Sequence, residues 1–340
     1  MRLSVLDQSP IPAGSTGSQA LHNTIDLARR VEALGYHRYW VAEHHGGPML
    51  AGPSPEALIG PIASATSRIR VGSGGVMLPH YSPFKVAETF SLLSGLYPER
   101  IDLGIGRAPG TDGMTMFALQ RDRRQASPDD FPQQLAELLG YLDGTIPPDH
   151  PFARLAEHLP GRPERPEPWL LGSSQDSASW AAQLGLPYSF ADFINREGPP
   201  IAQLYRERFE PSETLAAPTV SVGVWTLCAD TDEEAERLAS SSRMAMMLLR
   251  EGQLIPVPPV EKAERFLAAR GQAAGRRRRT VLGSPATVRT GLEEVAQLYG
   301  AEEVVVVTIT HDHAARVRSY ELIAEAFGLS AAAPAAAQAA

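Results

Sequence analysis

The 340-residue sequence has a single cysteine, Cys228, so no disulfide bond can form within the chain. One unpaired thiol is typical of proteins that stay in a reducing compartment, and we expect a cytoplasmic protein. No apolar run approaches the length that crosses a bilayer. Asp7 and Pro10 interrupt the only apolar stretch at the N-terminus, which argues against a signal peptide. We therefore expect no contact with a membrane.

Basic residues are also scarce. The chain has 31 Lys and Arg against 39 Asp and Glu, a formal net charge of −8. A nucleic-acid surface needs an excess of positive charge, so we expect no nucleic-acid partner. The local exception is Arg276 to Arg279, which reads either as a solvated loop or as a loop that contacts an anion. The 43% hydrophobic and 21% charged residues are ordinary values for a globular protein.

Two kinds of apolar segment alternate along the chain. Short runs of β-branched and aromatic residues predict strands, and longer runs with apolar residues three or four apart predict helices. We expect strands over residues 3–6, 39–43, 69–78, 101–105, 168–171, 188–191, 220–228 and 303–310, with helices after most of them. Such alternation predicts a parallel sheet with right-handed crossovers. Eight strands favour an α/β fold of the closed (β/α)8 TIM-barrel type over a doubly wound open sheet.

Two stretches interrupt this rhythm. Residues 107–167 follow the fourth strand and contain one clear helix, at about 131–142, so we read them as an insertion. Residues 251–283, between the seventh and eighth strands, are rich in proline and arginine, and we expect a mobile segment suited to act as a lid. Residues 1–328 then form a single barrel domain. Residues 329–340 are an Ala/Pro-rich tail that we expect to be disordered.

Polar side chains collect where the predicted strands end. In a (β/α)8 barrel these carboxyl ends meet at one face, where the active sites of such barrels lie. The most concentrated set follows the second strand, where an apolar run passes directly into Glu43, His44 and His45. The complete set is Asp7, Gln8, Glu43, His44, His45, His80, Arg107, Ser173, Ser174, Ser177, Asp192, His311, Asp312 and His313.

The segment from Gly172 to Ser177 joins a strand to a helix through one glycine and three serines. The first turn of a helix has unpaired N–H groups and the positive end of the helix dipole, which together can hold a phosphate. An ordinary helix cap needs only one serine. Both interpretations stay open. Arg107, at the end of the neighbouring strand, can supply the bidentate charge that a phosphate prefers.

Two glycine-rich segments need separate interpretations. Gly104 to Gly110 resembles a dinucleotide fingerprint, but Pro109 stands where the third glycine belongs, so a nicotinamide site is not supported. Gly72 to Gly75 lie inside an apolar strand, which glycine weakens. They mark either a bulge in the barrel or a place where a flat ligand lies against bare backbone.

The histidines raise the question of a metal site. His44 and His45 are adjacent in an extended segment and point to opposite faces, so they cannot both reach one ion without irregular backbone. The other pair, His311 and His313, reads equally well as a solvated turn with Asp312 as a helix cap. We therefore expect no catalytic metal, and keep a metal hydrolase only as a minor alternative.

Six segments, taken together, resemble the bacterial luciferase-like flavin-dependent monooxygenase family. The most distinctive are the glycine strand and the Gly-Arg-Ala-Pro-Gly-Thr-Asp stretch that contains Arg107. Within the family, the chain is similar to the branch of MsnO8-type luciferase-like oxidoreductases, associated with secondary metabolism. The segments are residues 40–45, 68–79, 98–112, 169–174, 181–187 and 283–288.

The resemblance implies a barrel that binds reduced FMN supplied by a separate flavin reductase. It further implies that the reduced flavin reacts with O2 and that one oxygen atom passes to a small organic substrate. Members of the family commonly pair, so we expect a homodimer. They often have a non-prolyl cis peptide under the flavin ring, which here falls at Gly74 and Gly75.

The family's functional residues carry over onto matching positions of this chain. The catalytic histidine corresponds to His44, as a general base or as a stabiliser of the oxygenated flavin. The phosphate site corresponds to Arg107, Ser173, Ser174 and Ser177, with one of Arg121, Arg123 and Arg124 as a second clamp.

This sequence departs from the family pattern at two loops. Gly46 and Gly47 follow the histidine pair, where members often have Asn or Phe, and His80 follows Pro79, where members often have Asn. Both loops are expected to border the substrate pocket. A deazaflavin-dependent oxidoreductase of the same fold and a non-catalytic flavin-binding protein are the alternative functions.

Overall fold

The computed structural model describes residues 1–108, 112–120, 124, 130–270 and 279–330. Eight parallel strands close into a barrel, because β1 pairs with β9 and β6 pairs with β7. The predicted (β/α)8 barrel is confirmed, and the open doubly wound sheet is excluded. The barrel strands are β1 (Arg2–Asp7), β2 (Arg38–Val41), β3 (Arg70–Met77), β4 (Ile101–Gly106), β5 (Glu167–Gly172), β6 (Tyr188–Ala191), β7 (Val220–Cys228) and β9 (Glu303–Val307).

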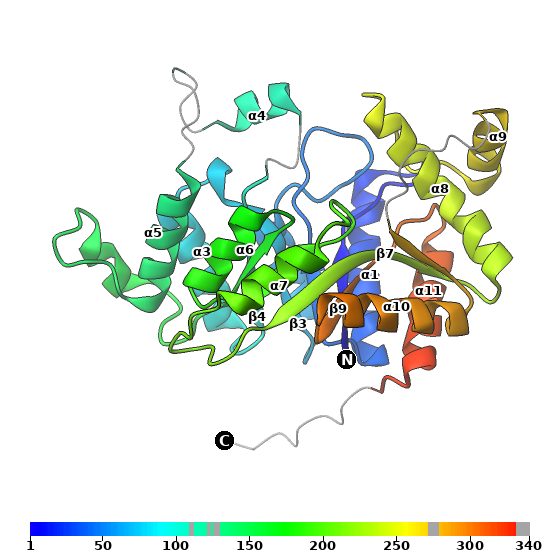
Figure 1. Ribbon diagram of the computed structural model, residues 1–340. Helices are drawn as coiled ribbons and strands as arrows, with labels where there is room; N and C mark the ends of the chain where they lie inside the picture. The colour runs from blue at the N-terminus through cyan, green and yellow to red at the C-terminus, as the bar shows by residue number, and fades with distance from the viewer. Residues whose placement is uncertain (109–111, 121–123, 125–129, 271–278, 331–340) are drawn as a thin grey trace, which may run out of the picture.

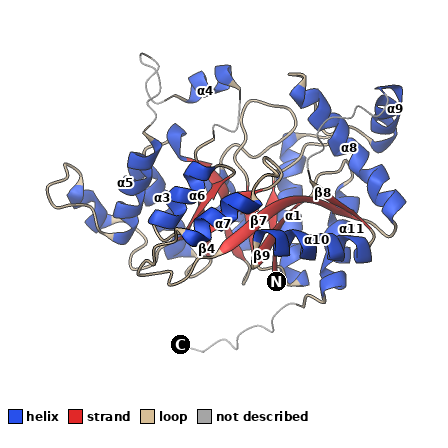
Figure 2. Cartoon of the chain, viewed as in Figure 1, coloured by secondary structure: helices blue, strands red, loops and turns tan. Residues whose placement is uncertain are grey.

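Helices surround the barrel (Figure 2). They are α1 (Gly17–Leu34), α2 (Pro55–Ala65), α3 (Pro83–Leu96), α6 (Gln175–Gln183), α7 (Pro199–Glu207), α8 (Asp232–Arg250), α10 (Pro285–Tyr299) and α11 (His313–Phe327). The sequence analysis missed α7, whose first turn contains two consecutive prolines. Prolines suggest a loop, but they are tolerated at a helix start because those N–H groups have no partner within the helix.

Alternate residues of β2 face two different hydrophobic cores. Tyr39 and Val41 of β2 pack in the layer between the barrel and the helices. Trp40, and Ala42 just after the strand, pack inside the barrel. This alternation follows from the extended backbone, in which successive side chains point to opposite faces. It also sets the direction of each polar residue that follows a strand.

The segment 251–283 is more regular than its prolines suggested. It contains α9 (Val260–Arg270), which packs on α8, and a ninth strand, β8 (Thr280–Gly283). The strand pairs with residues 225–228 of β7, of which 226–228 extend past the part of β7 that pairs with β9. Of the arginine run, Arg276 to Arg278 lie outside the described residues. The proposed role as a lid stays a prediction.

The insertion after β4 contains the expected helix as α5 (Phe131–Asp143). It adds a short helix, α4 (Gly113–Leu119), and a 3-10 segment, η2 (Ala153–His158). Figure 1 shows α4 and α9 on the side of the barrel away from the N-terminus, toward which the carboxyl ends of the strands point. The helices α4 and α9 therefore lie at the end of the barrel where the candidate site lies, whereas α5 packs against α3 at its flank.

The C-terminal helix α11 ends at Phe327, close to the predicted domain end. Most of the predicted disordered tail, residues 331–340, lies outside the described residues. Among the residues that the structure describes, no helix is long and apolar enough to cross a membrane.

Candidate functional site

His44 lies just beyond β2, which ends two residues earlier than the sequence suggested. Its backbone N–H donates to the carbonyl of Gly52 at 3.0 Å, and alternation from Trp40 and Ala42 places its side chain toward the barrel interior. The ring atom Nδ1 is buried and has no hydrogen-bond partner among the described residues. Burial, together with the nearby His45, lowers the pKa of His44 to about 4. At neutral pH the ring is therefore uncharged and can accept or donate a proton.

The glycine run of β3 lies where neighbouring strands approach closely. The strand has a register shift between Ser73 and Val76, so the bulge that we considered is present. The peptide bond between Gly74 and Gly75 is cis, as the resemblance implied. A Cβ atom at Gly74 would lie 2.5 Å from Leu6 Cδ1, and one at Gly75 would lie 2.7 Å from the Gly104 carbonyl oxygen. Packing alone therefore requires these glycines, and their contact with a flavin stays a prediction.

The serines before α6 are partly explained by helix capping. Ser174 and Ser177 form a reciprocal capping box, in which each hydroxyl accepts from the backbone N–H of the other, at 3.3 and 3.4 Å. The carbonyl of Ser173 accepts a hydrogen bond from Asn195, while the Ser173 hydroxyl has no partner among the described residues. Two of the three serines thus serve the cap. A phosphate site here depends on Ser173 and on the N–H groups of the first helical turn.

Arg107 reaches from the end of β4 to the start of α6. Its Nη2 lies 3.4 Å from Asp176 Oδ2, and its guanidinium carbon lies 5.1 Å from the centre of the Trp180 ring. The predicted proximity of Arg107 to the serine segment is therefore present. Of the arginines considered as a second clamp, Arg124 is exposed, and Arg121 and Arg123 lie outside the described residues. A cation beside a helix N-terminus can bind an anion.

Four of the predicted residues are held by specific partners within the protein. Asp7 is two residues after Val5 in β1, so its side chain also points outward to the helix layer. There it pairs with Arg316 at 2.6 Å. His311 and His313 contact the Ala13 carbonyl and Asp26, at 3.1 and 2.9 Å. Asp312 caps α11, as one of our interpretations held.

Asp192, after β6, also has outward parity. Its Oδ1 accepts from the Tyr299 hydroxyl at 2.7 Å and from Arg279 Nε at 3.1 Å. Burial raises the pKa of this carboxyl. Asp192 therefore joins the barrel to α10 and to the start of β8, and we assign it no role at the mouth. In the described parts of the chain, no group of three His, Cys, Asp or Glu could hold a metal ion.

Sequence reasoning missed a charged cluster at the opposite, N-terminal end of the barrel. The buried Arg38 forms ion pairs with Asp102 at 2.8 Å and with Glu167 and Glu303, both at 3.2 Å. Arg70 also pairs with Asp102 and Glu167. The signal in the sequence was a charged residue at or next to the start of several strands, namely Arg38, Asp102, Glu167 and Glu303.

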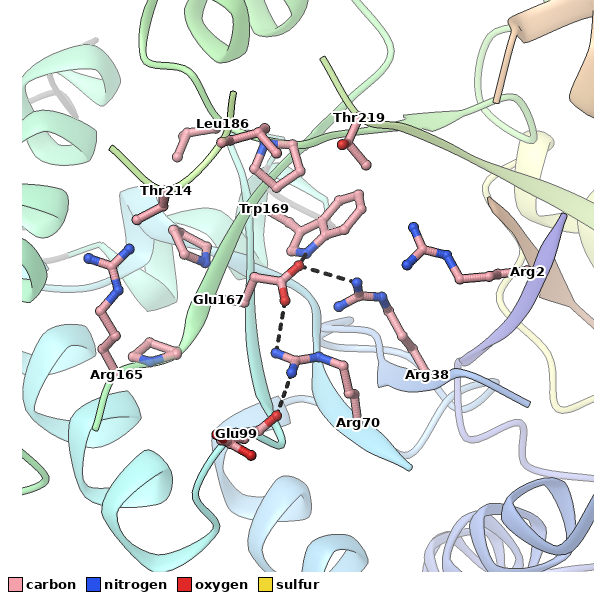
Figure 3. Close-up of a pocket in the computed structure, with 14 residues that line it drawn as sticks. Arg2, Arg38, Arg70, Glu99, Arg165, Glu167, Trp169, Leu186, Thr214 and Thr219 are labelled. Atoms are coloured by element: carbon pink, nitrogen blue, oxygen red, sulfur yellow. Dashed lines mark hydrogen bonds and ion pairs between the residues drawn. The ribbon is translucent and has the colours of Figure 1, made fainter. Parts of the chain in front are cut away.

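A hollow of about 740 Å³ lies beside this cluster, and Figure 3 shows that Glu167 projects between Arg38 and Arg70. Of the other arginines that line it, Arg165 pairs with Asp143 and Arg2 pairs with Glu302 and Glu303. Each arginine that lines the hollow is paired with a carboxylate, so the hollow offers no uncompensated positive charge. Charges at this face of a barrel serve stability.

Residues 1–302 match the family described as luciferase-like monooxygenase. The Bacillus subtilis (strain 168) protein YwcH is 45% identical, over 96% of this chain and 98% of its own. A luciferase-like monooxygenase of Escherichia coli (strain K12) is 41% identical, over 94% of this chain and 95% of its own. The N-acetyl-S-alkylcysteine monooxygenase of Bacillus subtilis (strain 168) is 36% identical, over 96% and 98%.

Solved structures with the same fold include apo-MsnO8, which is 41% identical with a TM-score of 0.87, over 96% of this chain and 98% of its own. The oxygenating constituent of 3,6-diketocamphane monooxygenase from Pseudomonas putida, in complex with FMN, has a TM-score of 0.71 at 20% identity, over 97% and 98%. An F420-dependent secondary alcohol dehydrogenase has a TM-score of 0.64 at 14% identity, over 96% and 98%.

Proposed function

We propose that this chain, which belongs to the luciferase-like monooxygenase family, uses reduced FMN and O2 to place one oxygen atom on a small organic substrate. The observation that carries the proposal is the arrangement at the carboxyl end of the barrel. A neutral histidine with a buried, unpartnered ring nitrogen lies at the same end as an arginine beside a helix N-terminus. The first can move a proton, and the second can hold a phosphate.

FMN fits the residues that are present. Arg107, the Ser173 hydroxyl and the first-turn N–H groups of α6 would hold its phosphate, and the bare backbone of Gly74 and Gly75 would border its ring. When bound, reduced FMN supplies the two electrons that activate O2. No nicotinamide fingerprint occurs in the sequence, which supports a separate reductase as the source of the reduced flavin.

The chain's own residues would then perform three tasks. His44 holds or moves a proton at its ring nitrogens, and its low pKa keeps it in the neutral form. The apolar interior cluster, which includes Trp225 and Leu171, excludes water from the side of the barrel that His44 faces. Arg107 orients the cofactor through its phosphate. None of these tasks needs a metal ion.

The test combines binding with product analysis. Anaerobic titration should show that the protein binds reduced FMN more tightly than reduced riboflavin, which lacks the phosphate. Turnover under isotopically labelled O2 should place one labelled atom in the product. The substrate panel begins with N-acetyl-S-alkylcysteines, because a relative at 36% identity is named for them. Failure to bind reduced FMN would overturn the proposal.

A deazaflavin-dependent oxidoreductase is the second candidate. The observation in favour of this candidate is that this chain has the same fold as the F420-dependent dehydrogenase. Parallel titrations with reduced FMN and reduced F420 separate the two. A non-catalytic flavin-binding protein is separated by His44→Ala. An enzyme should lose most, but not all, of its turnover and retain flavin, whereas a carrier should be unaffected by the substitution.

A homodimer is part of the proposal. On α3, Leu92 and Leu96 are 48% and 63% exposed, although large apolar side chains on a helix usually pack against another surface. Light scattering should give twice the mass of 36.6 kDa, and Leu96→Glu should shift the equilibrium toward the monomer. A monomeric mass at all concentrations would refute the dimer and leave the proposed chemistry untouched.

A further inference from the structure

Glu43, next to His44, has a fully buried carboxylate that the proposed chemistry does not use. Three donors from three places surround it. Its Oε2 accepts from the backbone N–H of Met77 at 2.9 Å. Its Oε1 accepts from the Tyr81 hydroxyl at 3.0 Å and from His45 Nε2 at 2.8 Å. Burying a carboxylate without hydrogen-bond donors is strongly unfavourable. The three donors therefore stabilise Glu43 in its buried position.

The three donors join two segments of the candidate site. Met77 is the last residue of β3, two positions after Gly75, and Tyr81 follows the 3-10 turn η1 (Leu78–His80). Glu43 itself precedes His44 directly. The carboxylate therefore ties the backbone that carries His44 to the backbone that continues from the glycine run. The strand pairing of residues 38–41 with 70–73 ends before His44, so this tie connects the two segments beyond their paired residues.

The partners of Glu43 are themselves held. Burial and the Glu43 charge raise the pKa of Tyr81 far above its ordinary value, so its hydroxyl stays protonated and donates. The His45 ring packs edge-on against His80, with ring centres 5.8 Å apart. Glu43 is thus held by one residue that follows β2, His45, and by two residues at and after the end of β3, Met77 and Tyr81.

We propose that Glu43 is a positioning residue: by binding Met77, Tyr81 and His45, it fixes the ring of His44 relative to the glycine segment of β3. This inference rests on the proposed function, in which His44 must face a flavin that borders that segment. Glu43 contacts no reacting atom. It acts through His44, and its loss therefore matters only while His44 is present.

The principal variant is Glu43→Gln, which keeps the shape and removes the charge. The Met77 N–H can only donate, so the amide oxygen must bind it, and the amide NH2 then faces His45 and Tyr81. The bond from Met77 then loses its charge assistance, and the bonds that Tyr81 and His45 donate to Oε1 are lost, so the tie to β3 is weakened. Tyr81→Phe is the milder variant, because it removes one donor and leaves the carboxylate. Glu233→Gln, an exposed carboxylate on α8, is the matched control.

A double-mutant cycle gives the decisive activity test. Glu43→Gln should lower product formation about tenfold to hundredfold, the cost of a displaced catalytic group. In the His44→Ala background the same substitution should cost nothing further. An equal loss in both backgrounds would overturn the proposal, because it would show a role independent of His44. The affinity for reduced FMN should change less than threefold.

A second readout uses the flavin-free protein and stays informative if the proposed chemistry fails. In NMR spectra of histidine-labelled protein, the His44 ring signals are those that disappear in His44→Ala. They should shift in Glu43→Gln and, by less, in Tyr81→Phe, and should not shift in Glu233→Gln. Unshifted His44 signals in both Glu43→Gln and Tyr81→Phe would refute the positioning role. If Glu43→Gln fails to fold, Tyr81→Phe carries both tests.

Discussion

Arg107 and Trp180 come from different elements, β4 and α6, yet the guanidinium carbon lies 5.1 Å from the centre of the indole ring. The ring supports the arginine side chain through a cation–π contact and directs it along the start of α6. Asp176, on the first turn of the same helix, lies 3.4 Å from Nη2 of the guanidinium. The guanidinium of Arg107 is therefore held beside the N-terminus of α6 by a ring and a carboxylate from that helix.

Replacing Arg107 should separate the phosphate contribution to binding from that of the ring. Arg107→Ala should weaken the binding of reduced FMN about tenfold to hundredfold, because a charge-assisted contact to the phosphate is lost. The affinity for reduced riboflavin should stay the same. Isothermal titration of both ligands checks this, with Arg237→Ala on α8 as the control. An equal loss for riboflavin would contradict a phosphate contact.

The low pKa of His44 predicts a pH dependence of stability. The pKa is about 4 in the folded protein and 6.5 in an unfolded chain, so the unfolded state binds a proton first as the pH falls. His44 should therefore destabilise the fold progressively between pH 6.5 and pH 4, by up to about 3 kcal/mol at the lower end. Denaturant unfolding of the wild type and of His44→Gln gives the free energy of unfolding of each protein at a series of pH values. The contribution of His44 is the change with pH in the difference between the two. Parallel profiles would contradict a depressed pKa.

Gly46 should resist substitution more than another glycine with a similar backbone. Its φ is +72°, and an added Cβ would lie 2.5 Å from Thr115 Oγ1 of α4. Gly14 has a φ of +87° and open space around it, so it isolates the backbone strain alone. Gly46→Ala should lower the free energy of unfolding more than Gly14→Ala, which should cost about 1 kcal/mol.

The contact with Thr115 can be tested by rescue. Thr115→Ala removes the hydroxyl and methyl groups that would collide, so it should recover part of the loss in Gly46→Ala. The measurement is thermal unfolding of the two single variants and the double variant. No recovery would show that backbone strain, and not the close approach of α4, limits this position.

The buried cluster at the N-terminal end of the barrel should be costly to break. Asp102→Asn removes the charge that pairs with both Arg38 and Arg70 and leaves two guanidiniums under-compensated. We expect a loss of about 3 to 5 kcal/mol in the free energy of unfolding. Because the pairs are buried, the loss should be insensitive to salt. A salt-sensitive loss below about 1 kcal/mol would match a surface pair instead.

The sequence predicted the fold and part of the site well, because both depend on local patterns. Strand periodicity and helix caps are short-range features, and they placed eight barrel strands in order. The proximity of Arg107 to the serine segment followed from adjacent strands ending at the same face. Parallel strands of a barrel all have their carboxyl ends at one face, so this proximity can be predicted without knowing the side-chain contacts.

The remaining features depend on distant parts of the chain. Arg38 pairs with Glu303, 265 residues away, and no local pattern predicts such a partner. β8 has four residues and forms only because β7 extends beyond β9. Asp7 and Asp192 were assigned to the mouth because they follow strands. Successive residues of a strand point to opposite faces, so the direction of these side chains depends on their exact place in the strand. The sequence does not define a strand end to within one residue.

The cluster around Arg38 also limits how molecules reach the interior of the barrel. The side chains of Arg38, Asp102, Glu167 and Glu303 close the N-terminal end, with carboxylates and guanidiniums satisfied by one another. Under the proposed function, a ligand that approaches His44 has to enter and leave through the opposite end. Cofactor and substrate would share one route, and the one that binds deeper has to arrive first and depart last.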